Sequence, residues 1–149
     1  MVWGGISLEA KTELHIFGRA SINAQVYVES IVQDYIVPYS HFIGEDFLLM
    51  HDNARPHAAL CVREYLQDTG IPTLQWPARS PDLNPIEHLW DQMARNIQWG
   101  NIPRTLPLLR NALHDEWERI QQPAVEDLIR SMPRRIRAVI TARGGNTKY

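Results

Sequence analysis

The sequence has very little cysteine: Cys61 is the only one in 149 residues. An intrachain disulfide and a cysteine-based zinc site are therefore excluded, and such sparse cysteine is typical of a reducing compartment. The chain also lacks an apolar run near the roughly 20 residues that span a bilayer. It has no basic start followed by an apolar stretch, as a secretory signal would have. The length of the chain suits a single domain, which can bury a real core.

The C-terminal end of the chain has no negatively charged side chains. No acidic residue follows Asp127, although the formal net charge of the whole chain is −2. The same stretch contains six basic residues, namely Arg130, Arg134, Arg135, Arg137, Arg143 and Lys148. Such asymmetry can serve a phosphate backbone. It is equally typical of a solvated helix face followed by a tail, and the sequence leaves both interpretations open.

The N-terminal half has the periodicities of strands and of one helix. Residues 2–7 and 12–17 predict a hairpin, because polar and apolar side chains alternate along its second arm. The next helix is expected to begin at a Ser21 cap and to end at Pro38. Its apolar positions recur at helical spacing at Val28, Ile31, Val32 and Tyr35. Residues 47–50 are too short an apolar run for a helix, and they predict a strand buried on both faces.

The rest of the chain predicts further alternation and then helices. A second helix should stop at Gly70, with one face formed by Ala58, Cys61, Val62, Tyr65 and Leu66. Residues 71–76 predict another strand and residues 77–84 a loop. A third helix should start at an Asn84 cap with Pro85 in its first position. The buried stripe of this third helix consists of Ile86, Leu89, Trp90, Met93 and Ile97. A later stripe predicts a further helix and consists of Leu106, Leu109, Leu113, Trp117 and Ile120.

This order of elements favours an α/β fold with some parallel strand pairing, in which ligands gather at the carboxyl ends of strands. Asp52 follows one predicted strand, and Glu87 lies in the helix after the next. Two carboxylates at one end of a sheet suit a hard divalent cation such as Mg²⁺. Each residue also has an ordinary structural interpretation. Glu87 could complete a capping box with Asn84, and Asp52 could be a turn residue.

Histidines near Asp52 offer an alternative site. His51, Asp52 and His57 could form a histidine-ligated transition-metal centre, which would make the chain a small metal hydrolase. The spacing of these residues is not diagnostic of such a centre. Unchanged metal affinity after replacing both His51 and His57 with alanine would remove this alternative.

Two long motifs resemble those of a known family. Residues 51–57, His-Asp-Asn-Ala-Arg-Pro-His, and residues 76–90, Trp-Pro-Ala-Arg-Ser-Pro-Asp-Leu-Asn-Pro-Ile-Glu-His-Leu-Trp, are similar to signature segments of the mariner superfamily of DNA transposases. They resemble the branch whose acidic triad is Asp, Asp and Glu with 34 residues between the last two. Residues 2–7 resemble the strand that precedes these segments, and residues 144–149 resemble the usual ending.

The resemblance implies a ribonuclease H-like fold, the architecture of retroviral integrases. It implies Mg²⁺-dependent hydrolysis at transposon ends in the nucleus, with Mn²⁺ as a substitute, and then strand transfer into target DNA. Asp52 and Glu87 would bind the metals, which would activate water and then a DNA 3′-hydroxyl. Asn53 and His57 match motif positions near this site, without an assigned role.

Two departures from the family pattern limit these expectations. The family's first catalytic Asp lies on a first strand, and no residue here matches it; the helix-turn-helix region that reads transposon ends is also absent. We therefore expect a ribonuclease H-like fold without its first strand, with a core of about 1–100, a helical extension of about 101–149 and impaired catalysis. Unsatisfied sheet edges would favour self-association. The alternative function is a non-catalytic DNA-binding or dimerising module that associates with an intact transposase.

Overall fold

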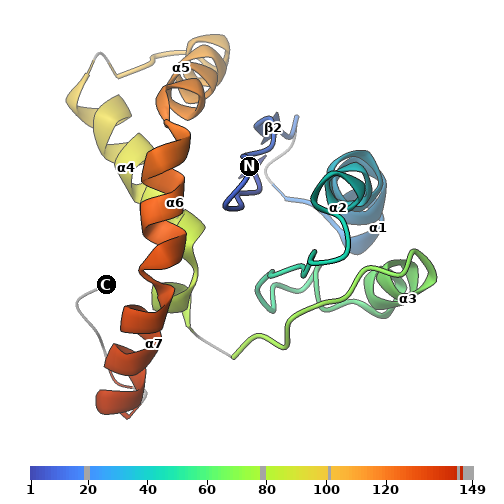
Figure 1. Ribbon diagram of the computed structural model, residues 1–149. Coiled ribbons are helices and arrows are strands. Elements are labelled where there is room, and N and C mark those ends of the chain that lie inside the picture. Colours follow the sequence, from blue (N-terminus) through green and yellow to red (C-terminus); the bar gives the residue numbers. More distant parts are fainter. Residues whose placement is uncertain (19–20, 78–79, 101, 144, 146–149) are drawn as a thin grey trace. The chain divides into compact units, whose positions relative to one another are not determined.

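The computed structural model describes residues 1–18, 21–77, 80–100, 102–143 and 145. The chain divides into two compact units (Figure 1). Unit 1 consists of residues 1–3 and 15–79, and unit 2 of residues 4–14 and 80–149. Of the features expected from the sequence, Lys148, residues 78–79 of the second motif and all of the C-terminal ending except Gly145 lie outside the described residues.

The predicted hairpin is present, although only its open end is paired as strands. In unit 1, β1 (Val2–Trp3) and β2 (His15–Ile16) are antiparallel, with Val2 opposite Ile16 and Trp3 opposite His15. In unit 2, residues 4–14 form one isolated antiparallel bridge, Ile6 to Lys11. The regular ladder stops between these points because the Thr12 hydroxyl oxygen accepts the hydrogen bond of the Gly5 N–H at 2.8 Å.

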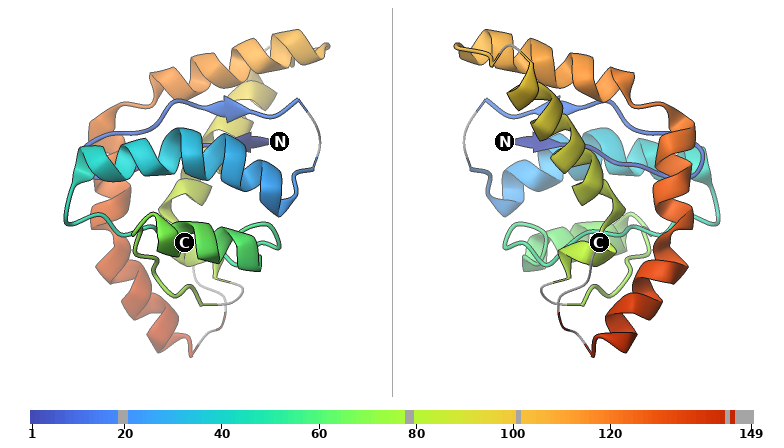
Figure 2. Two further views of the ribbon diagram at one scale, coloured as in Figure 1. Left: turned by 90° about the vertical axis from the view of Figure 1, so that its right-hand side faces the viewer. Right: turned by 90° about the vertical axis from the view of Figure 1, so that its left-hand side faces the viewer.

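A long helical rod forms the main element of unit 1. It consists of α1 (Ala24–Tyr27), the π-helix η1 (Val28–Ile36) and α2 (Val37–Ile43), which Figure 2 shows as one continuous helix. The rod begins after Asn23, whose side chain accepts from Val26 N–H, so the predicted Ser21 cap is wrong. The predicted end at Pro38 is also wrong.

Pro38 lies at the start of α2, where the chain changes from π-helical to α-helical register. Val37 N–H still donates to Val32 O, five residues back, and Pro38, which has no N–H to donate, falls where this π-helical spacing ends. The rod ends instead at Gly44, which has a φ of 85°. That left-handed conformation favours glycine and stops a right-handed helix.

The core of unit 1 is formed by the rod, by α3 (Leu60–Asp68) and by three loop segments. The rod contributes Tyr27, Val28, Ile31, Val32 and Ile36, and the other segments contribute Phe17, Leu49, Val62, Leu66 and Ile71. The buried positions of α3 are four residues apart, as one face of a helix requires. Cys61 was predicted on this buried face and is instead exposed, because it lies one residue from Val62 on the helix.

The two segments predicted as strands at residues 47–50 and 71–76 are paired at a single point. Leu49 and Thr73 form an isolated parallel bridge, in which Leu49 N–H donates to Pro72 O at 2.9 Å and Leu74 N–H donates to Leu49 O at 2.8 Å. The parallel pairing is confirmed. The prediction of a strand buried on both faces is wrong, because Leu49 is buried whereas Leu48 is 51% exposed.

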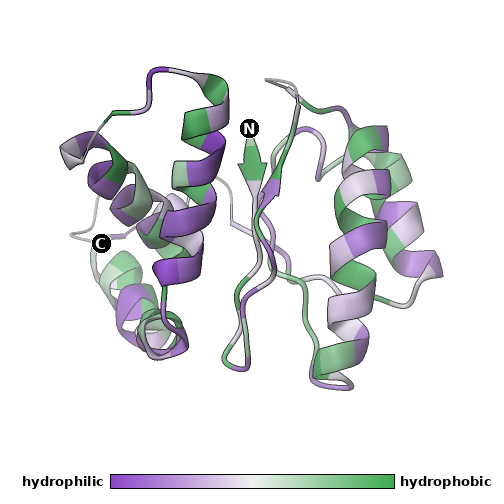
Figure 3. Cartoon of the chain, turned by 90° about the horizontal axis from the view of Figure 1, so that it is seen from above, coloured by the Kyte–Doolittle hydropathy of each residue, from purple (hydrophilic) through white to green (hydrophobic). Residues whose placement is uncertain are grey.

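Unit 2 is mainly helical. It contains the short 3₁₀ turn η2 (Pro81–Leu83), α4 (Pro85–Trp99), α5 (Leu106–Arg119), α6 (Gln122–Arg130) and α7 (Met132–Thr141). Figure 3 shows apolar and polar residues interspersed around these helices. Helix α4 begins after Asn84 with Pro85 in its first turn, as the sequence predicts. Among the described residues, no helix is both long enough and apolar enough to cross a membrane.

The core of unit 2 is centred on Trp117 of α5. Its ring stacks on Trp90 of α4 with centroids 5.3 Å apart, and its indole N–H donates to Thr12 O at 2.8 Å. Other buried apolar positions of the unit are Leu14, Leu89, Met93, Ile120 and Val125. The predicted apolar stripe of α5 holds at Trp117 and Ile120 but fails at Leu106, which is 76% exposed because it occupies the first position of the helix.

Candidate functional site

Asp52 lies in the loop that follows the Leu49 bridge of unit 1. Its side chain is 51% exposed. The Oδ1 atom accepts two hydrogen bonds, from Ala54 N–H at 3.0 Å and from His57 Nδ1 at 2.7 Å. The first of these is an Asx turn, so the expected turn function is present. Because both bonds fall on Oδ1, the carboxylate is held in one orientation while Oδ2 keeps its capacity for a further ligand.

A packed group of rings lies beside Asp52. The His57 ring stacks on that of His51, with centroids 5.1 Å apart and an interplanar angle of 13°. The centroid of the His57 ring also lies 4.3 Å from that of the Tyr27 ring. The Tyr27 hydroxyl lies 3.4 Å from His51 Nδ1. Burial, and then the nearby charge of Asp52, raises the pKa of Tyr27 far above its usual value, so the phenol stays protonated.

His51 is neutral in this environment. Burial lowers the pKa of His51 from 6.5 to about 4, with a smaller contribution from the neighbouring His57. Its Nδ1 faces the Tyr27 hydroxyl, which removes that nitrogen as a metal ligand. Within the described part of the chain, no group of three or more His, Cys, Asp or Glu side chains is arranged to hold a metal ion. The alternative of a histidine-ligated transition metal therefore gains no support.

Asp52 and His57 also line an open hollow of unit 1 of about 500 Å³. Asn53, the next residue along the first motif, donates from Nδ2 to Trp76 O at 2.9 Å. That bond joins the first motif to the beginning of the second. The hollow contains both polar groups and apolar side chains, among them Arg63, Gln67, Leu74 and Trp76.

Glu87 lies in the first turn of α4 in unit 2 and is exposed. The predicted capping box is not formed, because the Asn84 side chain makes no cap hydrogen bond with the helix backbone. Instead, Asn84 Nδ2 lies 3.4 Å from Glu87 Oε1 and donates to it. The position is favourable for a carboxylate even so, since the N-terminal end of a helix carries partial positive charge.

The two predicted site residues thus belong to different units, Asp52 to unit 1 and Glu87 to unit 2. Both are exposed carboxylates, which provide the hard oxygen ligands that Mg²⁺ and Mn²⁺ accept. The donor chemistry of these residues therefore fits a divalent cation. His57 was noted in the motif without a role, and its bond to Asp52 is the feature that sequence spacing alone did not reveal.

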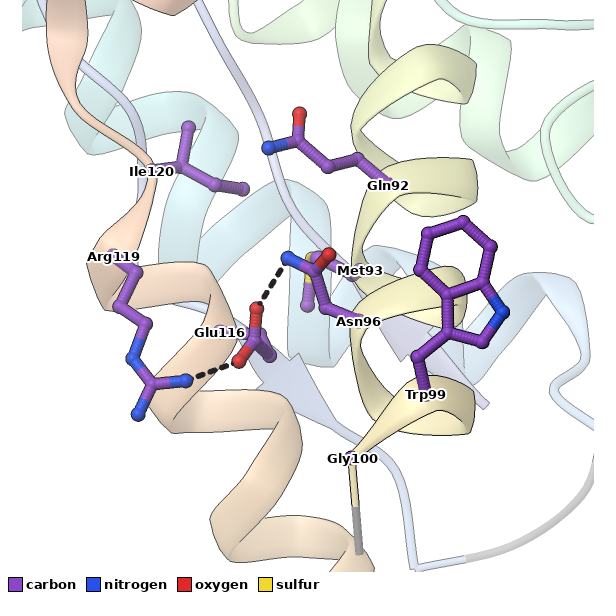
Figure 4. Close-up of a pocket in the computed structure, with 8 residues that line it drawn as sticks. All are labelled: Gln92, Met93, Asn96, Trp99, Gly100, Glu116, Arg119 and Ile120. Atoms are coloured by element: carbon purple, nitrogen blue, oxygen red, sulfur yellow. Dashed lines mark hydrogen bonds and ion pairs between the residues drawn. The ribbon is translucent and has the colours of Figure 1, made fainter. Parts of the chain in front are cut away.

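A third acidic residue, Glu116, is excluded as a metal ligand by its partners. It lines a hollow of unit 2 of about 440 Å³ together with Asn96 and Arg119 (Figure 4). Asn96 Nδ2 donates to Glu116 Oε2 at 2.8 Å, and Arg119 forms an ion pair with Oε1. Both oxygens of this buried carboxylate are therefore already engaged, and its charge is balanced.

The basic C-terminal end is only partly a surface feature. Arg135 of α7 is 2% exposed, and its Nε donates to Ser131 Oγ at 2.8 Å while a terminal nitrogen lies 3.3 Å from His88 Nδ1. Arg130 pairs with Glu126 at 3.6 Å. Arg135 therefore belongs to the interior of unit 2 and fits neither of the two interpretations of the basic end. The exposed basic residues of the described end include Arg134 and Arg137.

Comparisons with known proteins show the family to which the chain is similar. The sequence model described as DDE superfamily endonuclease matches residues 2–109. The chain is 36% identical over 151 residues to the Tc1 transposase of Caenorhabditis elegans, covering 100% of this chain and 54% of that protein. It is 33% identical over 152 residues to the Tc3 transposase of the same organism, covering 100% and 45%. The chain thus spans about half the length of the curated relatives that it matches.

Solved structures agree with the sequence comparison. The Mos1 transposase catalytic domain with raltegravir and Mn matches with a TM-score of 0.82 at 19% identity, over 99% of this chain and 76% of that one. The Mos1 mariner paired-end complex with Mn matches with a TM-score of 0.76 at 22% identity, over 91% and 40%. These matches confirm the predicted ribonuclease H-like fold class, and together with the family match over residues 2–109 they show that the chain belongs to the DDE superfamily endonucleases.

Proposed function

We propose that this chain is a catalytic portion of a cut-and-paste DNA transposase. Its activity would be divalent-metal-dependent cleavage of a DNA strand, followed by transfer of that strand to a new site. The observation that carries the proposal is Asp52, an exposed carboxylate held by His57 and Ala54 in one of the two family motifs. Similarity to the Tc1 and Tc3 transposases over the whole chain supports the same reaction.

Asp52 and Glu87 would bind the metal, and 34 residues separate them, as in the branch of the family that the motifs resemble. Mg²⁺ is the proposed cofactor and Mn²⁺ a substitute; Mos1 catalytic domain structures contain one or the other. When bound, such ions activate a water or hydroxyl nucleophile and stabilise the leaving oxygen. The chain's own contribution is to hold Asp52 through Oδ1 and to present Glu87 at a helix N-terminus, both accessible to solvent.

The proposed partners are the ends of a transposon and the target DNA. Mos1 has been solved in a paired-end complex and in a strand transfer complex, which supports DNA as the partner of a protein with this fold. We propose the nucleus as the site of action, because the substrate would be chromosomal DNA.

A cleavage assay tests the proposal. The chain would be incubated with a labelled duplex that carries a transposon end, with Mg²⁺, with Mn²⁺ or with a chelator. We expect metal-dependent nicking at an impaired rate, because no residue here matches the family's first catalytic Asp. Asp52→Asn and Glu87→Gln should abolish this nicking, because each change replaces a carboxylate ligand with a neutral amide. Asp91→Asn is the matched control, since Asp91 is an exposed acid on the same helix, one turn after Glu87. Cleavage that persists in both site variants would overturn the proposal.

A second candidate function is binding to DNA, or to an intact transposase, without catalysis. Arg134 and Arg137 favour it, because both are exposed on α7 and no acidic residue follows Asp127. Binding of this kind would weaken steeply as salt rises, since each phosphate contact releases counterions. Absence of DNA binding at low salt would exclude it.

A further inference from the structure

The hydrogen bond between His57 and Asp52 is the strongest side-chain contact that Asp52 makes. His57 Nδ1 lies 2.7 Å from Asp52 Oδ1, a short separation for a nitrogen donor to a carboxylate oxygen. The His57 side chain is 18% exposed, compared with 51% for Asp52. The histidine is therefore the more buried partner, and the carboxylate is the one that reaches solvent.

The His57 ring packs against two neighbouring rings. The ring of Tyr27, which is 0% exposed, has its centroid 4.3 Å from that of His57, and the His51 ring stacks on His57 with centroids 5.1 Å apart. The Tyr27 hydroxyl in turn lies 3.4 Å from His51 Nδ1. This packing fixes the plane of the His57 ring and with it the direction of the Nδ1–H bond. The backbone N–H of Ala54 approaches the same Oδ1 atom at 3.0 Å.

We propose that His57 is a positioning residue: its Nδ1–H holds Asp52 Oδ1 so that Oδ2 is presented to the divalent metal. The proposal rests on the proposed function, in which Asp52 is a metal ligand. Groups that hydrogen-bond a metal ligand orient it before the metal arrives, and their loss typically weakens metal binding about 10–100-fold. His57 itself does not touch the metal or the DNA in this assignment.

The nitrogen of His57 that bonds to Asp52 is Nδ1, and substitutions can test this nitrogen separately from Nε2. An asparagine at position 57 places its amide nitrogen where histidine Nδ1 lies, whereas a glutamine reaches the position of Nε2. His57→Asn should therefore preserve the bond to Asp52, and His57→Gln should lose it. A merely structural role, which depends on ring packing against Tyr27 and His51, would be damaged by both changes alike.

The test is Mn²⁺ binding to the chain, measured from the electron paramagnetic resonance signal of the free ion. We expect His57→Gln to weaken Mn²⁺ binding by about tenfold or more and His57→Asn to retain it to within a few-fold. His41→Gln is the matched control, because His41 is an exposed histidine of α2 in the same unit. Thermal unfolding of each variant confirms that it is folded.

The outcomes separate this inference from the proposed function. If Asp52→Asn abolishes Mn²⁺ binding but both His57 variants bind as the unmodified chain does, or lose affinity equally, the positioning role is wrong and the metal site stands. If the unmodified chain does not bind Mn²⁺, or Asp52→Asn changes nothing, the proposed function fails. In that case, nitrogen-15 NMR of the His57 ring tests the hydrogen bond to Asp52 independently of metal binding. A proton on Nδ1 supports it, and a proton on Nε2 only would overturn it.

Discussion

Arg134 and Arg135 are neighbours in α7 with opposite environments, so substitutions at the two positions should change different properties of the chain. Arg135 is 2% exposed, whereas Arg134 is exposed. Replacing Arg135 with methionine keeps a long apolar side chain but removes the guanidinium that bonds to Ser131 and His88. Replacing Arg134 with glutamate reverses a surface charge. One change should affect stability and the other DNA binding.

The magnitudes follow from the two environments. A hydrogen bond to a charged group contributes about 1.5–3 kcal/mol, and a polar group left without a partner costs about 1–3 kcal/mol. Ser131 and His88 are half-buried, and Ser131 Oγ keeps a bond to Leu128 O at 2.6 Å, so part of this cost is relieved by water and by that bond. We expect Arg135→Met to lower the free energy of unfolding by about 2–3 kcal/mol. Arg134→Glu should change it by less than about 0.5 kcal/mol.

DNA binding supplies the complementary measurement. If Arg134 contacts a phosphate, Arg134→Glu should reduce the slope of log affinity against log salt by about 1 or more. Arg135→Met should leave that slope unchanged under conditions where the variant is folded. The assays are urea unfolding and fluorescence-anisotropy titrations at several salt concentrations. A stable Arg135→Met variant with a reduced salt slope would refute the assignment of this arginine to the interior.

Two further predictions concern close packing and pH. A Cβ at Gly4 would lie 2.8 Å from Trp117 Cη2, and Trp117 is 1% exposed, so Gly4→Ala should destabilise the chain by about 1–3 kcal/mol in urea unfolding. Gly18→Ala should be neutral or slightly stabilising, because among the described residues beyond its chain neighbours no atom lies within 4 Å of the added carbon; equal effects at the two sites would contradict the packing. The pKa of His51 is about 4 when folded and 6.5 ordinarily, so the unfolded chain binds more protons and stability should fall as pH drops from about 7 toward about 4. With a chelator present, the free energy of unfolding should fall by about 1–2 kcal/mol between about pH 7 and about pH 5, and by less in His51→Gln. An equal fall in that variant would show that His51 is not the source of the pH dependence.

The parts of the fold that sequence predicts well are those with strong local signals. The start of α4 follows from Asn84 and Pro85, because a capping residue followed by proline favours only one position in a helix. The antiparallel hairpin follows from the alternation at residues 12–17. Asp52 and Glu87 as site residues, taken from the motifs and their spacing, stay a prediction; both are exposed carboxylates, Asp52 in a loop and Glu87 in the first turn of α4.

The parts that sequence did not predict depend on tertiary contacts. Pro38 lies inside the helical rod because the change from π-helical to α-helical register accommodates it, and no local rule anticipates that. Arg135 is buried because Ser131 and His88, the latter 47 residues away, bond its guanidinium. The bond from His57 to Asp52 depends on a turn whose geometry is set by the packing of His57 against Tyr27.

The central proposal is that Asp52 and Glu87 both bind divalent metal. Line broadening of backbone amide signals by Mn²⁺ tests it most directly, because a paramagnetic ion broadens the nuclei closest to it. Amides that flank Asp52 and amides that flank Glu87 should broaden first and at the same Mn²⁺ concentration, and excess Mg²⁺ should restore both sets. Broadening confined to one set, or broadening that Mg²⁺ does not reverse, would contradict the account.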